Sequence, residues 1–559
     1  MYEQVYEPVA GSLALSALVA AIPIVVLFVL LAGVRVAAQW ASLATLAVAL
    51  VIAVLVYGMP VGLALDSTLL GAAFGLFPIV WIVINAIFIY NVIVETGHFD
   101  TIRDSLAGIS NDRRIQVVLI AFVFGALLEA TAGFGTPVAI TGSLMAGLGF
   151  EPIYAAALAL LANTAPVAFG GFGIPILTGA TVAGLDTMEL SQMVGRQTPF
   201  LALIIPGMLV TVMAGFRRML EVWPVVAVSG ITFAGTQSLV SNLLGPELAD
   251  LLAAIITVVA VVALLAVWRP GSEWHFEHEP PAAQRESFDE PPLGRTLYAW
   301  SPFVIIIALF LLAQVPPIKD AIGGIQTAVN FPTAEVSETT GLPAVPWPGL
   351  NEQVEQRPPV VPEPTPYPAT LSTNWLSAAG TLILIADIIS LIVLRVGPGR
   401  ALRIYGRSLN QLKWAILTIA SILGLAYLLN YSGITYTLGL AFAATGALFP
   451  FFAAFIGWLG VALTGSDTSS NALFANLQKV TAQQIGISPI LTVGANSSGG
   501  VLGKMISPQN LAVGTSATGL QGKEGDLLRL VFKWSIGLTV VMAILVTLQA
   551  YVLTFMVPG

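Results

Sequence analysis

The stretch GALLEATAGFGTP, Gly125 to Pro137, decides the fold, because it places a carboxylate and several helix-breaking residues between long apolar runs. ANTAPVAFGGFGIP, Ala162 to Pro175, follows about one helical hairpin later. The C-terminal half holds a degenerate copy of this pair, with GSDTSSNALFANLQ at Gly465 to Gln478 and GANSSGGVLGKMISPQ at Gly494 to Gln509. In each copy an acid comes first and an asparagine triplet follows. Acids and carboxamides beside glycines in hydrocarbon are typical of a polar site lined by discontinuous membrane helices.

The composition excludes a water-soluble globule. The chain is 57% hydrophobic and 9% charged, and its mean hydropathy is +0.88. Apolar runs near the length of ~20 residues that crosses a bilayer occur at 11–32, 38–57, 68–94, 199–216, 247–268, 298–315, 375–394, 412–430, 434–456 and 531–556. These runs are too long and uniform for the alternating pattern of a β-barrel. We therefore predict an all-α polytopic membrane protein with about 12 to 16 membrane elements, a range set by the broken regions 115–185 and 459–520.

The chain divides into two membrane halves. We expect an N-terminal half over 1–268 with the first repeat, a cytoplasmic linker over 269–297, and a C-terminal half over 298–559 with the second repeat. The bias of Lys and Arg toward the cytoplasm places the acidic segment 316–374 and both termini outside. Because this segment is rich in proline, we expect a stretch such as 357–368 to be extended and polyproline-like rather than packed, and the segment to be a stiff external loop rather than a binding module for proline-rich partners.

Glycines and prolines beside the polar residues predict where helices break. Proline lacks a backbone N–H, and glycine permits non-helical dihedral angles. The predicted helix breakers are Gly133, Gly135, Pro137, Gly170, Gly171, Gly173, Pro175, Gly499, Gly500 and Pro508. A break inside the membrane leaves backbone groups that only protein, water or a bound molecule can satisfy, so these breaks should line a cavity.

The polar residues around the breaks are suited to a small anion. Freed N–H groups and the positive end of a half-helix dipole favour a carboxylate, and hydroxyl and amide side chains add fixed hydrogen bonds. The predicted substrate-binding residues are Thr131, Asn163, Thr164, Ser469, Asn471, Asn496, Ser497, Ser498, Lys504, Ser507 and Gln509.

Three charged residues in apolar surroundings need an explanation. A carboxylate in a low-dielectric site can bind and release a proton near neutral pH, so Glu129 and Asp467 are candidates for proton coupling, with structurally paired acids as the alternative. Lys504 is either a counter-charge for an anion or an acid, or a lysine whose side chain extends to a membrane face. Asp387 lacks nearby breakers, so we expect it to be a helix-packing partner.

Three motifs carry a family resemblance. Gly125 to Pro137, Gly465 to Phe474 and Gly503 to Gln509 resemble the signature stretches of the bacterial L-lactate permease family, and the resemblance extends over nearly the whole chain in length and hydropathy. It implies uptake of L-lactate, and of D-lactate and glycolate, in symport with protons across the bacterial inner membrane. The wider superfamily to which this family is similar uses two inverted repeats with re-entrant hairpins and Ser-Asn-Thr motifs at their tips.

The matching triplets here are Ala162-Asn163-Thr164 and Ala495-Asn496-Ser497. Alanine in place of the first serine removes a hydroxyl ligand, which weakens the case for sodium coupling. The partners that we expect are a small organic anion and the lipid bilayer, with no nucleic acid, no metal and no cofactor apart from the coupling proton.

Other classes remain open on the sequence. These are an anion channel, a sodium-coupled carboxylate transporter and an intramembrane aspartyl protease that uses Asp387 and Asp467. A channel needs no titratable acid, and the protease leaves the duplicated asparagine triplets unexplained. We therefore expect a transporter and not an enzyme.

Overall fold

The computed structural model describes residues 1–133, 135–276, 291–331, 333–336 and 343–558. Among these residues, 11 helical segments are long and apolar enough to cross a membrane. The number is 12 if the pair Pro152–Ala162 and Val167–Ala183, bent by 62°, forms one span. The chain is thus a helical multi-pass membrane protein, with a span count at or just below the low end of the predicted range.

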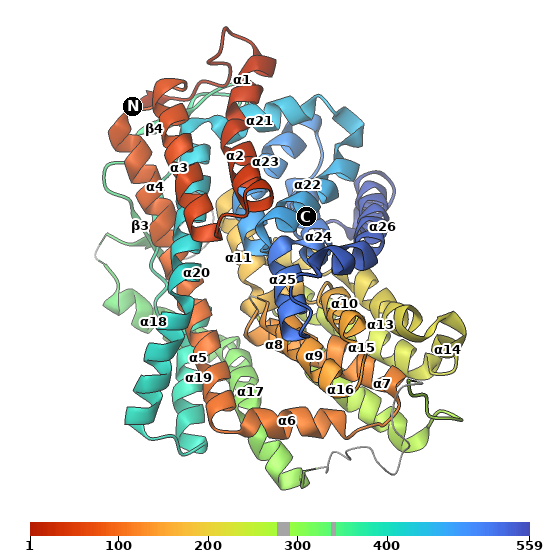
Figure 1. The fold of residues 1–559 in the computed structure, drawn as a ribbon. Helices are drawn as coiled ribbons and strands as arrows, with labels where there is room; N and C mark the ends of the chain where they lie inside the picture. Colours follow the sequence, from red (N-terminus) through yellow and green to blue (C-terminus); the bar gives the residue numbers. More distant parts are fainter. Residues whose placement is uncertain (134, 277–290, 332, 337–342, 559) are drawn as a thin grey trace.

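The N-terminal half, coloured red to yellow-green in Figure 1, contains sixteen α-helices among its described residues. They are α1 (Leu13–Ala20), α2 (Ile22–Phe28), α3 (Ala38–Leu55), α4 (Val61–Phe74), α5 (Trp81–Glu95), α6 (His98–Ala107), α7 (Arg113–Val117), α8 (Gly125–Thr131), α9 (Thr136–Gly147), α10 (Pro152–Ala162), α11 (Gly170–Ala183), α12 (Thr187–Val194), α13 (Thr198–Ala214), α14 (Phe216–Leu220), α15 (Trp223–Leu243) and α16 (Ala249–Val267). Some of these helices are joined into longer spans by stretches of π-helix, which are η1 (Val29–Gly33), η2 (Gly75–Val80) and η3 (Val118–Phe124). A turn of 3₁₀ helix, η4 (Val167–Phe169), precedes α11.

The C-terminal half is coloured green to blue. Its helices are α17 (Leu293–Ala313), α18 (Pro316–Val329), α19 (Ala379–Val393), α20 (Pro398–Ser432), α21 (Ile434–Ala443), α22 (Phe449–Thr464), α23 (Asp467–Ile485), α24 (Pro489–Gly503), α25 (Pro508–Ala517) and α26 (Glu524–Tyr551), with the short turns η6 (Gly446–Leu448), η7 (Lys504–Ile506) and η8 (Thr554–Met556). The strands are β1 (Tyr2–Glu3), β2 (Glu335–Val336), β3 (Pro343–Pro346), β4 (Val354–Gln356), β5 (Thr365–Pro366) and β6 (Thr370–Ser372).

The helices pack in two groups that mix the two halves. The 35-residue helix α20 lies along α3, α4 and α5, and α19 packs on α5 (Figure 1). In the second group α22 and α24 pack together with α23 and α26, and α11 packs on α23. Because each group combines segments far apart in the sequence, a site between the groups receives residues from both halves.

Gly499 and Gly500 do not break a helix, so this prediction was wrong. Both lie inside the continuous helix α24, and the chain first leaves regular helix at η7, before Ser507 and Pro508. A Cβ on Gly499 would lie 2.2 Å from the backbone oxygen of Ala454 on α22. These glycines therefore serve close helix packing, which small residues permit in membrane proteins.

The proline-rich segment holds a helix and strands, and its stretch 357–368 is not one extended polyproline-like chain, which corrects a second prediction. The chain turns after Arg357, where Val360 N–H donates to the Arg357 carbonyl over 3.1 Å, and then enters β5. It begins with α18 and continues into two three-stranded sheets, of order β1-β4-β5 and β2-β3-β6. Strand β4 pairs in parallel with β1, Val354 is fully buried, and Tyr431 Oη donates a hydrogen bond to the Pro368 carbonyl (2.7 Å). Partners distant in sequence thus fold the segment onto the ends of the membrane helices.

Two predicted apolar spans also differ from the structure. The run 434–456 is divided between α21 and α22, because the chain turns at Ala444 and Thr445. The run 375–394 contains only the 15-residue helix α19. Residues 277–290, which make up half of the predicted linker, lie outside the described residues.

We expect Gly499→Ala to lower thermal stability, although alanine is the better helix former. Overpacking a tight interface costs about 1–3 kcal/mol, which outweighs the gain in helix propensity of about 1 kcal/mol. Gly147→Ala, at a helical position with open space around it, is the matched control and should leave stability unchanged or raise it. Thermal unfolding of both variants in detergent, followed by tryptophan fluorescence, measures the difference, and equal midpoints would contradict the packing role.

Candidate functional site

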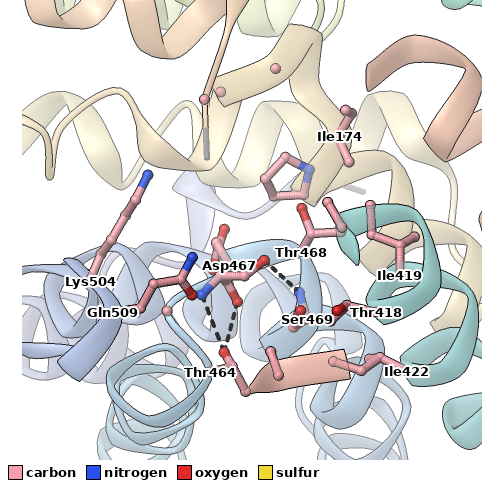
Figure 2. A pocket seen from close by; sticks show the side chains of 18 of the residues that line it. Ile174, Thr418, Ile419, Ile422, Thr464, Asp467, Thr468, Ser469, Lys504 and Gln509 are labelled. Carbon is pink, nitrogen blue, oxygen red and sulfur yellow. Dashed lines mark hydrogen bonds between the residues drawn. The ribbon is translucent and has the colours of Figure 1, made fainter. Parts of the chain in front are cut away.

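A cavity of about 260 Å³ lies between the two helix groups and is lined from both halves of the chain. Figure 2 shows Asp467, Lys504 and Gln509 around one hollow, with Thr418 and Ile419 of α20 on its other side. The polar and charged lining residues are Gln39, Glu129, Thr418, Thr464, Ser466, Asp467, Thr468, Ser469, Lys504 and Gln509. Acids, a base and hydroxyl groups therefore share one small chamber.

Glu129 and Lys504 form a buried ion pair. Lys504 Nζ donates to Glu129 Oε1 over 2.7 Å, and the two side chains are only 7% and 5% exposed. Asn163 Nδ2 donates to the other carboxylate oxygen over 2.9 Å. Of the two roles predicted for Lys504, the structure therefore shows the counter-charge for an acid. The side chain does not extend to a membrane face.

The chain geometry around Glu129 explains how the acid reaches the cavity. Helix α8 ends at Thr131, and Gly133 and Gly135 have positive φ values of 53° and 82°, which favour glycine. Helix α9 then begins at Thr136. Glu129 is therefore held in the last turn before a break, and its carboxylate faces the turn at Lys504.

Asp467 is the first residue of α23 and keeps one oxygen free of protein partners. Ser497 Oγ donates to Asp467 Oδ2, while Oδ1 has no hydrogen-bond partner among the described residues. Asn471 Nδ2 donates to the Pro175 carbonyl over 3.0 Å, and Asn496 Nδ2 donates to Asn471 Oδ1 over 2.8 Å. An amide network behind Asp467 therefore joins the two halves, and the unpartnered Oδ1 is buried beside Gly500 of α24.

Two helix starts face the same chamber. Ile174 and Pro175 of α11 line it, and so do Asp467 and Ser469 in the first turn of α23. Gly171, Phe172 and Gly173 are left-handed, so the regular part of α11 starts only after them. The N-terminal ends of helices favour negative charge. The chamber therefore offers an anion two helix dipoles as well as Lys504.

The structure brings part of the predicted site together. Nine predicted residues line the cavity: Glu129, Gly133, Gly170, Gly171, Pro175, Asp467, Ser469, Lys504 and Gln509. Others are used inside the protein. Thr131 and Thr164 donate to carbonyls of their own turns, Ser498 donates to Gln197 Oε1, and Ser507 caps α25. Asn163, Asn471, Asn496 and Ser497 support the acids from behind.

Several cavity residues were missed from the sequence. Gln39 and Thr418 lie on α3 and α20, which carry no break near them, so nothing in their local sequence distinguishes them. Asp250 was also missed, although it is a buried acid at the start of the apolar run 247–268. Asp387, predicted to be a helix-packing partner, is fully buried on α19, which packs against α5 and α17, and neither of its carboxylate oxygens has a hydrogen-bond partner among the described residues.

Membrane-crossing helices around a buried chamber that holds two acids and a base define a membrane transport protein. The chain belongs to the L-lactate permease family, because the model of that family matches residues 16–553. It is 46% identical to the L-lactate permease of Bacillus subtilis and 45% identical to that of Escherichia coli K12, with 100% of each chain covered. It is also 45% identical to the glycolate permease GlcA of Escherichia coli K12, with 99% of both chains covered. The protein is therefore a permease and not an enzyme.

Two solved structures show a distant similarity. One is the YdaH transporter of Alcanivorax borkumensis, with 15% identity, a TM-score of 0.46 and 87% of both chains covered. The other is MtrF of Neisseria gonorrhoeae, with 13% identity, a TM-score of 0.45, and 86% of this chain and 83% of that chain covered.

We expect the stabilities of Lys504→Met and Glu129→Gln to be non-additive. Removing the lysine alone leaves a buried unpaired carboxylate, which costs about 3–5 kcal/mol. The double variant removes both charges and should be more stable than Lys504→Met alone. Thermal unfolding of the three variants in detergent at neutral pH tests this expectation. A double variant as unstable as the sum of the two single losses would mean that the pair is not coupled in solution.

Proposed function

We propose that this protein imports L-lactate and the related 2-hydroxymonocarboxylates D-lactate and glycolate, in symport with protons, across the bacterial inner membrane. Membership of the L-lactate permease family and the glycolate permease among its relatives support this substrate class. The cavity of about 260 Å³ is smaller than the ~300–1,000 Å³ typical of pockets for drug-sized ligands, which suits a small acid.

The buried pair of Glu129 and Lys504 beside Asp467 is the observation that carries the proton coupling. Two carboxylates and one ammonium share the chamber, so a bound substrate anion would add a second unbalanced negative charge. Charge in a low-dielectric site is costly unless it is paired or neutralised. In the proposed cycle the substrate carboxylate takes Lys504 as its partner, and Glu129 takes up a proton. Substrate and proton then bind together at a lower electrostatic cost than either alone.

Other groups in the chamber match the rest of a 2-hydroxy acid. We assign the substrate carboxylate to Lys504 and the starts of α11 and α23, where positive charge is concentrated. The side chain of Gln509, which lines the chamber, is placed to form a hydrogen bond with the 2-hydroxyl group. Ile419 and Ile422 of α20 provide an apolar wall for the methyl group of lactate, which glycolate lacks.

We also propose that the two halves are inverted repeats, with one membrane half over 1–268 and the other over 298–559. Helices α8, α9, α10 and α11 correspond to α22, α23, α24 and α25. In each set the first helix ends at left-handed glycine, Gly133 or Gly465, and the third is followed by a short turn of 3₁₀ helix, η4 or η7. The substrate site would then be shared by equivalent breaks of the two repeats.

Reconstituted protein should accumulate labelled L-lactate against its gradient when the vesicle lumen is alkaline. The pH difference drives the proton that accompanies the anion, so a protonophore should abolish accumulation. Unlabelled D-lactate and glycolate should compete, and replacement of sodium by potassium should have no effect. Uptake unaffected by the protonophore, without uphill accumulation, would indicate a channel, and dependence on sodium would indicate a different coupling ion.

Glu129→Gln should impair uphill uptake far more than exchange of internal for external lactate. Exchange needs no net proton movement, whereas uphill uptake requires a group that binds and releases the proton. Both rates are measured in the same vesicles with labelled L-lactate. Full retention of uphill uptake would remove Glu129 from the proton-carrying role. An equal loss of both rates would assign it to substrate binding alone.

A further inference from the structure

Asp250 is a third buried acid close to the site. It lies in the first turn of α16, is 1% exposed, and packs where α16 meets α8, the helix of Glu129. Its Oδ1 accepts a hydrogen bond from Gln237 Nε2 over 2.7 Å, and its Oδ2 has no partner among the described residues. A carboxyl oxygen left unsatisfied in a membrane protein interior is costly and points to a functional role.

A hydrogen-bonded connection leads from Asp250 toward Glu129. Gln237 Nε2 also donates to the carbonyl of Ala165 over 3.3 Å. Ala165 lies in the same short break as Asn163, whose side chain holds Glu129. Asp250 also lies within electrostatic range of Glu129. The two acids are therefore attached to one break, between α10 and α11.

A second cavity, of about 200 Å³, lies among α17, α18, α19 and the segment before α16. Its lining includes Glu247, which precedes α16, and Phe310 of α17. Phe172, in the left-handed kink, stacks on Phe310 at a ring-centroid distance of 6.1 Å, while Gly171 beside it lines the central cavity. The α11 kink thus contacts a lining residue of the second cavity and contributes a lining residue to the first.

The segment before α16 packs closely against the kink of α11. A Cβ on Gly173 would lie 2.6 Å from Pro246 Cβ, so only glycine allows the loop to approach the kink. Glu247 follows Pro246, faces the second cavity and is three residues from Asp250. Burial raises the pKa of Glu247 to about 7.

We propose that Asp250 is a proton-carrying residue of the transport cycle, which receives protons from the second cavity by way of Glu247 and passes them to Glu129. This inference rests on the proposed proton symport. A proton leaves the Glu247 carboxyl for the Asp250 carboxylate and then leaves Asp250 for the Glu129 carboxylate. Each donor returns to its ionised state, and only O–H bonds form and break. The proton thereby reaches the site without crossing the chamber that holds the substrate.

Few charged groups surround Asp250 to compete with this role. Among the elements that pack against α16, α8 contributes Glu129, while α15 and η3 contain no charged or titratable residue. Glu247 lies on the connection into α16 itself, and Lys319 of α18 lines the same cavity as Glu247. The proton affinity of Asp250 is therefore set chiefly by burial, by Gln237 and by the charge on Glu129.

The test compares Asp250→Asn with Asp387→Asn in full-length protein in proteoliposomes. Asp387 is the matched control, because it is also a fully buried acid on a membrane helix, it lines neither cavity, and neither of its carboxylate oxygens has a hydrogen-bond partner among the described residues. Asp250→Asn should reduce accumulation driven by the pH difference by at least about tenfold while reducing lactate exchange far less, and Asp250→Glu should restore accumulation. Asp387→Asn should retain both activities.

Two further measurements separate proton transfer from a structural effect. Infrared difference spectra in water and heavy water should lose a protonated-carboxyl band in Asp250→Asn, and Glu247→Gln should alter the pH profile of net uptake but not that of exchange. Wild-type accumulation and pH profile in Asp250→Asn would overturn the proposal, and so would equal losses of exchange and accumulation that Asp250→Glu does not restore. If uptake by the wild-type protein does not depend on the pH difference, the result contradicts the proposed proton symport rather than the role of Asp250.

Discussion

The ion pair between Lys504 and Glu129 is the interaction on which the rest of the site depends. It brings two charges together where neither could remain alone at acceptable cost. To do so, α8 must end just after the acid, and the helix before the lysine must give way to η7. The breaks that make the pair also direct helix ends into the chamber. Charge pairing and anion affinity therefore have one structural origin.

The fold could be predicted where a local property decides it. Apolar runs of about 20 residues indicate spans, and Gly133 and Gly135 adopt the positive φ values that only glycine adopts easily. Gly499 and Gly500 show the limit, because a glycine that admits a neighbouring backbone has the same sequence signature as one that breaks a helix. The prediction for the proline-rich segment was wrong for a related reason. Its packing depends on Tyr2 and Tyr431, which are remote in the sequence.

The same distinction applies to the site. Glu129, Asp467 and Lys504 are conspicuous because charges within membrane segments are expensive and rare. Which acid pairs with Lys504 depends on tertiary packing, and the sequence left both choices open. Too many hydroxyl groups were predicted to bind substrate, because the side chains of Thr131 and Thr164 donate hydrogen bonds to backbone carbonyls of their own turns. Thr418 was missed because it lies on a helix without a break.

The partners of the central ion pair are 375 residues apart, which has a consequence for biosynthesis. Glu129 enters the bilayer long before the ribosome has made Lys504, so the nascent chain carries an acid without its cation through most of translation. An acidic side chain at the centre of a membrane helix costs about 2.5–3.5 kcal/mol during insertion. The incomplete chain is therefore less stable in the bilayer than the finished one, and a truncated product would present an unpaired intramembrane carboxylate to membrane quality control.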